Sequence, residues 1–121
     1  MDGSILTTIK KLVNISDMDE SFDTDLIVHI NTYLRRCNQL GVGKRSFRVY
    51  DKSQKWSDFV QPGQETFDQV IDYVYMRCKL IFDPPTNGSG IKALEDGYHV
   101  LEWLLRADAE SDILQDELIE V

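Results

Sequence analysis

The chain has 121 residues, of which 42% are hydrophobic and 28% charged, and its formal net charge is −8. This length suits one domain with one modest core, and the composition is ordinary for a soluble globular protein. No apolar run approaches the roughly 20 residues that a membrane span requires. The first residues show neither a basic stretch nor a long apolar stretch, so we expect no secretory signal. The two cysteines, Cys37 and Cys78, are expected to be reduced thiols packed in a core.

The charge is distributed unevenly along the chain. Residues 1–25 carry a net charge of −4, residues 26–82 a net charge of +4, and residues 83–121 a net charge of −8. Sequence-specific DNA binding usually shows a basic footprint, so the acidic total argues against it. The asymmetry permits head-to-tail contact between copies, in which an acidic end faces a basic middle.

Two helices are predicted in the first third of the chain. Residues 4–13 place apolar side chains on one helical face, and Ser4 is a suitable N-cap. After an acidic loop, a second helix begins near Ser21 or Asp23, where carboxylates suit the positive end of the helix dipole. The glycines that follow Leu40 are natural helix terminators.

The remaining segments predict two more helices and a connecting arm. Residues 44–63 indicate a protruding arm with at most one β-ribbon and a short helical turn. Residues 66–82 show the strongest helical periodicity in the chain. Residues 83–90 predict a loop, since two prolines and two glycines fall within them. A fourth helix is predicted over residues 91–107.

The sequence thus predicts an all-α, single-domain bundle of about four helices, with residues 1–106 as the domain and 107–121 as an acidic C-terminal tail. From residue 108 onward the tail has six carboxylates and no basic side chain. It also contains Ile113, Leu114 and Leu118, which suit an amphipathic helix that docks on a partner. A frayed terminus fits the same residues equally well.

The sequence contains no recognisable catalytic or metal-binding motif. Residues 41–45 contain two glycines and two basic residues, but they lack P-loop spacing and follow a helix rather than a strand. Residues 17–28 begin like a calcium loop yet lack its glycine and its final glutamate. His29 and His99 have no second histidine or cysteine at ligand spacing. We therefore expect no enzyme activity, no cofactor and no metal.

The aromatic residues of the arm have two interpretations. Trp56 and Phe59, with Lys52 and Lys55 nearby, suit a stacking surface for single-stranded nucleic acid. They suit better an aromatic anchor that pins the arm to the core or to a neighbouring subunit. Because a polar arm offers these rings little core, we expect them, together with Arg48, to contact another subunit.

Five blocks of the sequence carry a recognisable pattern, in this order: residues 21–31, 38–43, 56–59, 73–85 and 101–103. Together they resemble the head–tail connector (adaptor) proteins of long-tailed double-stranded DNA bacteriophages and their prophage relatives. The resemblance spans about residues 5–106, and Phe82-Asp83-Pro84-Pro85 is its most specific part.

The resemblance implies a small helical virion protein, made in the bacterial host cytoplasm and located at the head–tail junction. Such proteins form a homo-oligomeric ring, often of about a dozen copies, whose head-to-tail contacts close on themselves. The ring sits under the portal protein and binds the next tail-side completion or stopper protein. Double-stranded DNA passes through it without specific binding, and the family has no catalytic residues to carry over.

An interaction module of another class remains an alternative. An acidic DNA mimic that occupies a nucleic-acid-binding protein would present one continuous acidic face. The basic charge of residues 26–82 weakens this interpretation.

Overall fold

The computed structural model describes the backbone of residues 3–119 and the side chains of residues 3–111. Within these residues it contains helices and no strand, so the protein is all-α, as predicted. The helices are α1 (Ile5–Leu12), α2 (Asp23–Gln39), α3 (Trp56–Phe59), α4 (Glu65–Phe82) and α5 (Gly88–Ile119).

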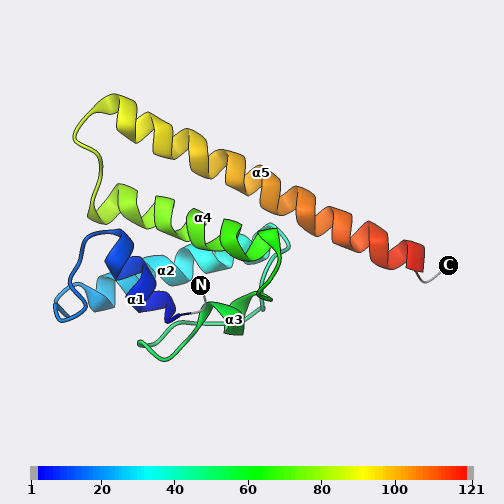
Figure 1. Cartoon of the computed structure of the whole chain (residues 1–121), viewed down its shortest axis with the longest axis horizontal. Helices are drawn as coiled ribbons and strands as arrows, with labels where there is room; N and C mark the ends of the chain where they lie inside the picture. Colours follow the sequence, from blue (N-terminus) through cyan, green and yellow to red (C-terminus); the bar gives the residue numbers. More distant parts are fainter. Residues whose placement is uncertain (1–2, 120–121) are drawn as a thin grey trace.

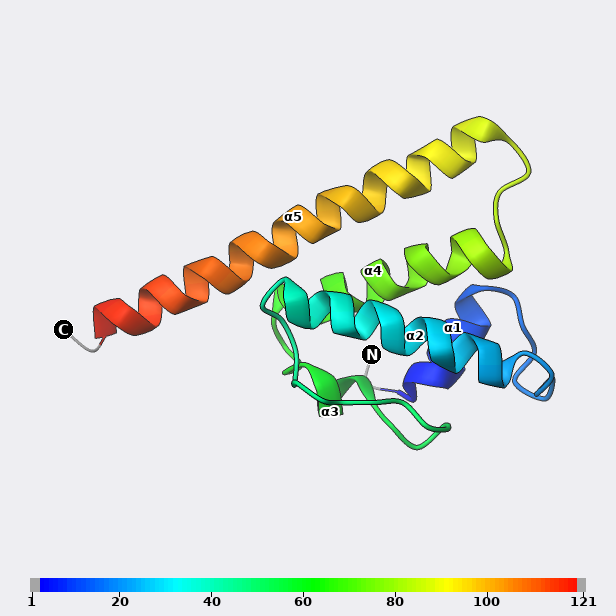
Figure 2. The same ribbon diagram turned by 180° about the vertical axis from the view of Figure 1, so that it is seen from behind.

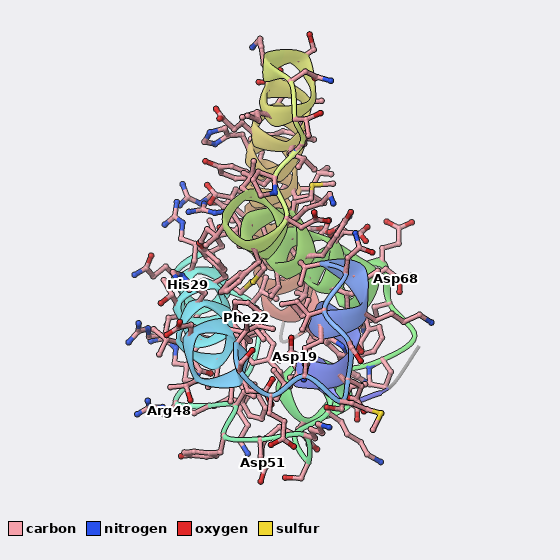
Figure 3. All side chains as sticks on the ribbon, turned by 90° about the vertical axis from the view of Figure 1, so that its left-hand side faces the viewer. Asp19, Phe22, His29, Arg48, Asp51 and Asp68 are labelled. Carbon is pink, nitrogen blue, oxygen red and sulfur yellow. The ribbon has the colours of Figure 1, made fainter. Side chains whose placement is uncertain are left out.

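The helix α4 is the middle layer of the fold. It contacts α1 and α2 on one side and α5 on the other, and α5 runs back along it in the opposite direction (Figure 1). The end-on view shows the same order, with α5 above α4 and the α1–α2 pair below (Figure 3). Because α4 lies between two layers of helices, it buries apolar side chains on both of its sides. This explains why residues 66–82 show the strongest apolar periodicity in the sequence. Its buried residues are Phe67, Val70, Ile71, Tyr73, Val74 and Cys78.

The first two helices begin as the sequence predicts. The amide of Thr7 donates a hydrogen bond to Ser4 Oγ at 3.2 Å, which is the N-cap bond expected for α1. Asp23 and Asp25 lie in the first turn of α2. After α2, Gly41 adopts a left-handed backbone with φ of 96°, as a helix-terminating glycine does.

A buried lysine organises the acidic loop between α1 and α2. The Lys10 side chain is fully buried, and its Nζ donates hydrogen bonds to the carbonyl oxygens of Asp17 at 3.2 Å and Asp19 at 2.8 Å. The same Nζ forms an ion pair with Asp23 Oδ1 at 2.8 Å. The ammonium group thus occupies the middle of a loop that begins like a calcium site, and it fixes the entry into α2. The sequence did not predict a charged residue in the core.

The structure confirms the prediction that both cysteines are free thiols packed in the core. Cys37 of α2 and Cys78 of α4 are both buried and free. Burial raises the pKa of each thiol to about 12, so neither ionises near neutral pH.

The predicted protruding arm is incorrect. Val49, Trp56 and Phe59 are buried with the residues of the main core, and Trp56 has no exposed surface. In the described residues, the β-ribbon reduces to one isolated bridge between Ser4 and Lys55. Residues 44–63 lie against the core because the two aromatic rings of α3 point inward. Burying two large rings stabilises this arrangement.

The last helix is longer at both ends than predicted. It begins at Gly88, inside the predicted loop, where Asn87 Oδ1 accepts a hydrogen bond from the amide of Gly90 at 2.7 Å in the manner of an N-cap. It continues past residue 106 without a break, and Ala109 packs against the core beside Gly41. Its final turns project beyond the other helices (Figure 2).

Gly43 and Gly63 provide a matched test of how the 44–63 segment is held. Both have left-handed φ, 87° and 88°, but a Cβ on Gly43 would collide with the Phe59 ring whereas a Cβ on Gly63 would meet open space. We expect Gly63→Ala to cost about 1 kcal/mol of unfolding free energy from backbone strain alone. Gly43→Ala should cost about 1–3 kcal/mol more, because the ring must also move. Urea unfolding of the two variants measures the difference, and equal losses would show that Phe59 does not pack on Gly43.

Candidate functional site

A polar cluster centred on Glu102 fastens α5 to the rest of the protein. Tyr73 of α4 donates its hydroxyl hydrogen bond to Glu102 Oε2 at 2.6 Å. Arg36 of α2 forms an ion pair with Oε1 at 3.4 Å, and Arg77 of α4 forms one with Oε2 at 3.4 Å. One carboxylate therefore links three helices, and Leu105, which is fully buried one turn further on, adds an apolar contact.

Aromatic rings hold Arg77 in position within this cluster. Its guanidinium carbon lies 4.7 Å from the ring centre of Tyr33 on α2 and 4.2 Å from that of Tyr98 on α5. Stacking of this kind is favourable because the ring faces carry negative potential. The positive charge therefore lies between two helices as well as beside Glu102.

The surroundings of Glu102 favour its ionised form. Burial by itself would raise the pKa of this carboxyl group, but the hydrogen bonds from Tyr73 and Arg36 outweigh burial and hold its pKa below the ordinary value. Burial, followed by the bond to Glu102, raises the pKa of Tyr73, which stays protonated and donates. The cluster is thus a structural clamp with its charges fixed.

A groove opens between α2 and the segment 46–50. We call it the α2 groove; its volume is about 600 Å³. Its floor is fixed by the buried Asn31 of α2, whose side-chain amide donates to the Val49 carbonyl at 3.0 Å and whose Oδ1 accepts from the Val49 amide at 2.8 Å. The lining residues are Thr24, Ile27, Val28, Asn31, Arg35, Asn38, Ser46, Phe47, Arg48, Val49 and Tyr50.

The α2 groove is apolar with a basic rim. Val28 is 58% exposed and Tyr50 is 69% exposed, so the groove leaves apolar surface open to solvent. Among the lining residues the charged ones are Arg35 and Arg48, with no carboxylate to balance them. An apolar floor with uncompensated positive charge suits a protein partner that is apolar at its centre and acidic at its edge.

A second exposed apolar surface lies on a flank of α5 that borders the end of α2, since Trp103 lines a small pocket together with Arg36 and Leu40. We call it the outer face of α5; its centre is Trp103, which is 69% exposed, and Val100, one turn earlier, is 56% exposed. Trp103 lies two positions before the buried Leu105, and two positions turn an α-helix by about 200°. Trp103 and Leu105 therefore point to different sides of α5, and the exposed Arg106 follows Trp103 on the same flank.

The predicted interface residues are not brought together. Trp56 and Phe59 are 0% and 3% exposed, so the expectation that they contact a neighbouring subunit is wrong, because the chain's own core accepts them. Arg48 is exposed on the rim of the α2 groove. Ile113, Leu114 and Leu118 fall on α5 beyond the side chains that the structure describes.

The sequence contained a signal for the exposed apolar surface of α5, although this surface was not predicted. Val100 and Trp103 are large apolar residues three positions apart, and they fall outside the predicted core stripe of the last helix. An apolar pair opposite a core stripe indicates a second buried face. Asn31 and Glu102 carried no such signal, since only the fold shows what an isolated polar residue in a helix meets.

The described residues offer no metal site and no membrane span. No group of three histidine, cysteine, aspartate or glutamate side chains among them could hold an ion. The ring of His29 meets Phe82 edge-on with 5.5 Å between centres, and His99 lies beside Tyr98. None of the helices, as far as they are described, is both long and apolar enough to cross a bilayer.

A family model described as phage connector protein matches residues 5–112. This chain belongs to the phage connector protein family. No curated protein and no solved structure matches it.

Membership gives the connector a structural role in the phage particle. The matched region extends past Arg106 to Asp112, and it includes Ala109, which packs against the core.

The Glu102 clamp predicts a specific dependence of stability on pH. Glu102→Gln removes charge-assisted bonds and should cost about 1.5–3 kcal/mol of unfolding free energy at pH 7. Because the pKa of Glu102 is lower in the folded protein, its contribution is complete above the ordinary value of 4.5 and is lost as the pH falls through the folded pKa. The stability gap between wild type and Glu102→Gln should therefore narrow as the pH falls below 4.5. Thermal melts between pH 7 and pH 3 measure the gap, and a constant gap would contradict the clamp.

Proposed function

We propose that this connector forms a closed ring of about a dozen copies at the phage head–tail junction, between the portal protein and the tail-side completion or stopper protein. The observation that carries the proposal, beside family membership, is the pair of unlike, uncovered surfaces. When copies join through two different surfaces, each end of an open row of copies still presents one unused surface. Further copies can therefore add until the row closes into a ring.

The chemistry of the chain supports passage of DNA without retention. Its net charge is −8. Proteins that bind the DNA backbone do so mainly with lysine and arginine side chains, which neutralise phosphates and release the counterions of the DNA. An acidic ring offers DNA little such attraction. Double-stranded DNA therefore slides through the centre, and specificity resides in the protein–protein contacts above and below.

The portal contact is assigned to the end of α5. From residue 108 onward the chain has six carboxylates and no basic side chain, together with Ile113, Leu114 and Leu118. The backbone of these turns projects beyond the other helices (Figures 1 and 2). A basic groove on the portal would relieve their mutual repulsion and bury the apolar side chains, so binding should weaken with salt.

Truncation after Ser111 tests this assignment. The shortened chain keeps the contact of Ala109 with the core and the hydrogen bond between Thr66 and Asp108, so it should melt like wild type. Mixed with the portal of the same phage, wild type should elute as a ring-sized complex that weakens as salt is raised, whereas the truncated chain should not bind. The matched control is a full-length chain with Lys92→Ala, at the other end of α5. Unchanged portal binding by the truncated chain would overturn the assignment, and wild type that neither binds the portal nor oligomerises would overturn the proposed function.

A further inference from the structure

Three arginines from two helices surround one pocket on the α2 side of the molecule. Arg35 and Arg36 of α2 and Arg77 of α4 line this pocket, which has a volume of about 500 Å³. We call it the arginine pocket. Like charges repel one another, so guanidinium groups gathered in one place are favourable only where anionic groups approach them. The remaining lining residues are uncharged: Thr32, Tyr33 and Gln39.

The chain itself balances only part of this charge. Glu102 pairs with Arg36 and with Arg77, at 3.4 Å in each case, so one carboxylate serves two of the guanidinium groups. Arg35 is exposed, and among the described residues it has no ion-pair partner. The arginine pocket therefore retains positive charge that an incoming carboxylate can neutralise.

The neighbouring turns of α5 do not cancel the remaining charge. Glu95 lies two turns before Glu102 on the same face of the helix, but it is exposed and does not line the arginine pocket. Arg106, one turn after Glu102, is exposed as well and lines an adjoining small pocket. One further carboxylate on this flank is thus offset by one further guanidinium.

The exposed side of α4 carries carboxylates without cations. Glu65, Asp68 and Asp72 follow one another at steps of three and four residues, so they form one stripe along the helix, which we call the acidic stripe. None of the three has an ion pair within the described residues. Burial, followed by the charge of Asp68, raises the pKa of Asp72, as expected for carboxylates one turn apart. Lys79, two turns further along, is already paired with Asp83 at 2.8 Å.

The two charged surfaces lie on opposite sides of the molecule. His29, whose ring is stacked on that of Tyr33 in the arginine pocket, lies on the α2 side in the end-on view (Figure 3). Asp68 of the acidic stripe lies on the other side of α4 in the same view. One copy therefore cannot bring its own stripe to its own pocket.

We infer that the acidic stripe of one copy binds the arginine pocket of the next copy, with Asp68 and Asp72 facing the guanidinium groups that Glu102 leaves unbalanced. This inference rests on the proposed function, and it names the contact that builds the ring. Copies joined through unlike surfaces on opposite sides present the same two surfaces again at every step.

A second copy suits the pocket better than a DNA backbone does. Contact between copies relieves the repulsion within the pocket and the repulsion within the stripe together, and guanidinium groups bind carboxylates through paired hydrogen bonds. A phosphate backbone would neutralise the pocket but leave the stripe without a cation. It would also be repelled by a chain whose net charge is −8.

Charge reversal on each side tests the contact. Arg35→Glu reverses the pocket without touching the ion pairs of Glu102, and Asp68→Lys reverses the stripe. Each should weaken assembly roughly tenfold or more at low salt, and the loss should shrink as salt is raised. The matched control is Lys92→Glu, which makes the same change of charge but lines neither surface. All three side chains are exposed, so the variants should melt like wild type. Light scattering over a concentration series measures assembly, alone or on the portal if wild type assembles only there.

Combining the two reversals shows which surfaces meet. In a chain with both Arg35→Glu and Asp68→Lys, each copy again presents opposite charges to the next, so assembly should return. An equimolar mixture of the two single variants should assemble for the same reason. Failure of either combination would overturn the inference, as would an Arg35→Glu variant that assembles like wild type but no longer binds short duplex DNA or the portal. In each of these cases a wild-type ring leaves the proposed function standing, whereas wild type that forms no assembly, alone or on the portal, rejects both.

Discussion

The arrangement of this connector depends on one half-buried carboxylate. Glu102 accepts a hydrogen bond from Tyr73 at 2.6 Å and pairs with Arg36 and Arg77, which belong to the two helices beneath α5. An ionised carboxylate with little exposure is tolerable only when donors surround it, and here they come from two other helices. Displacing α5 would leave two guanidinium groups and a hydroxyl without their acceptor. The cluster therefore specifies where α5 lies as well as stabilising it.

The clamp holds α5 from one side and leaves Trp103, the neighbour of Glu102 in the sequence, exposed. Leu105 enters the core, Trp103 is exposed, and Ala109 still packs against the core further along the helix. Asn31 in turn holds the segment that shapes the α2 groove. Internal polar contacts thus position two external apolar surfaces.

The sequence predicted the helices better than it predicted their partners. Periodicity and capping residues identified α1, α2 and α4, since these depend on local chemistry. Trp56 and Phe59 were misplaced because composition alone cannot show that a polar segment folds back onto a core. The start of α5 was missed because two glycines next to Asn87 resemble a loop more than a capped helix. Lys10, Asn31 and Glu102 could not be assigned from sequence, because their partners lie on other elements.

The central claim is that the Glu102 cluster, rather than general packing, holds α5 in place. Amide hydrogen exchange of wild type and Glu102→Gln, measured under identical conditions, tests it most directly. If the cluster contributes about 1.5–3 kcal/mol, amides in residues 94–109 should exchange roughly ten- to a hundredfold faster in the variant while α1 and α2 keep their protection. Unchanged exchange across α5, or equal acceleration in every helix, would contradict the claim.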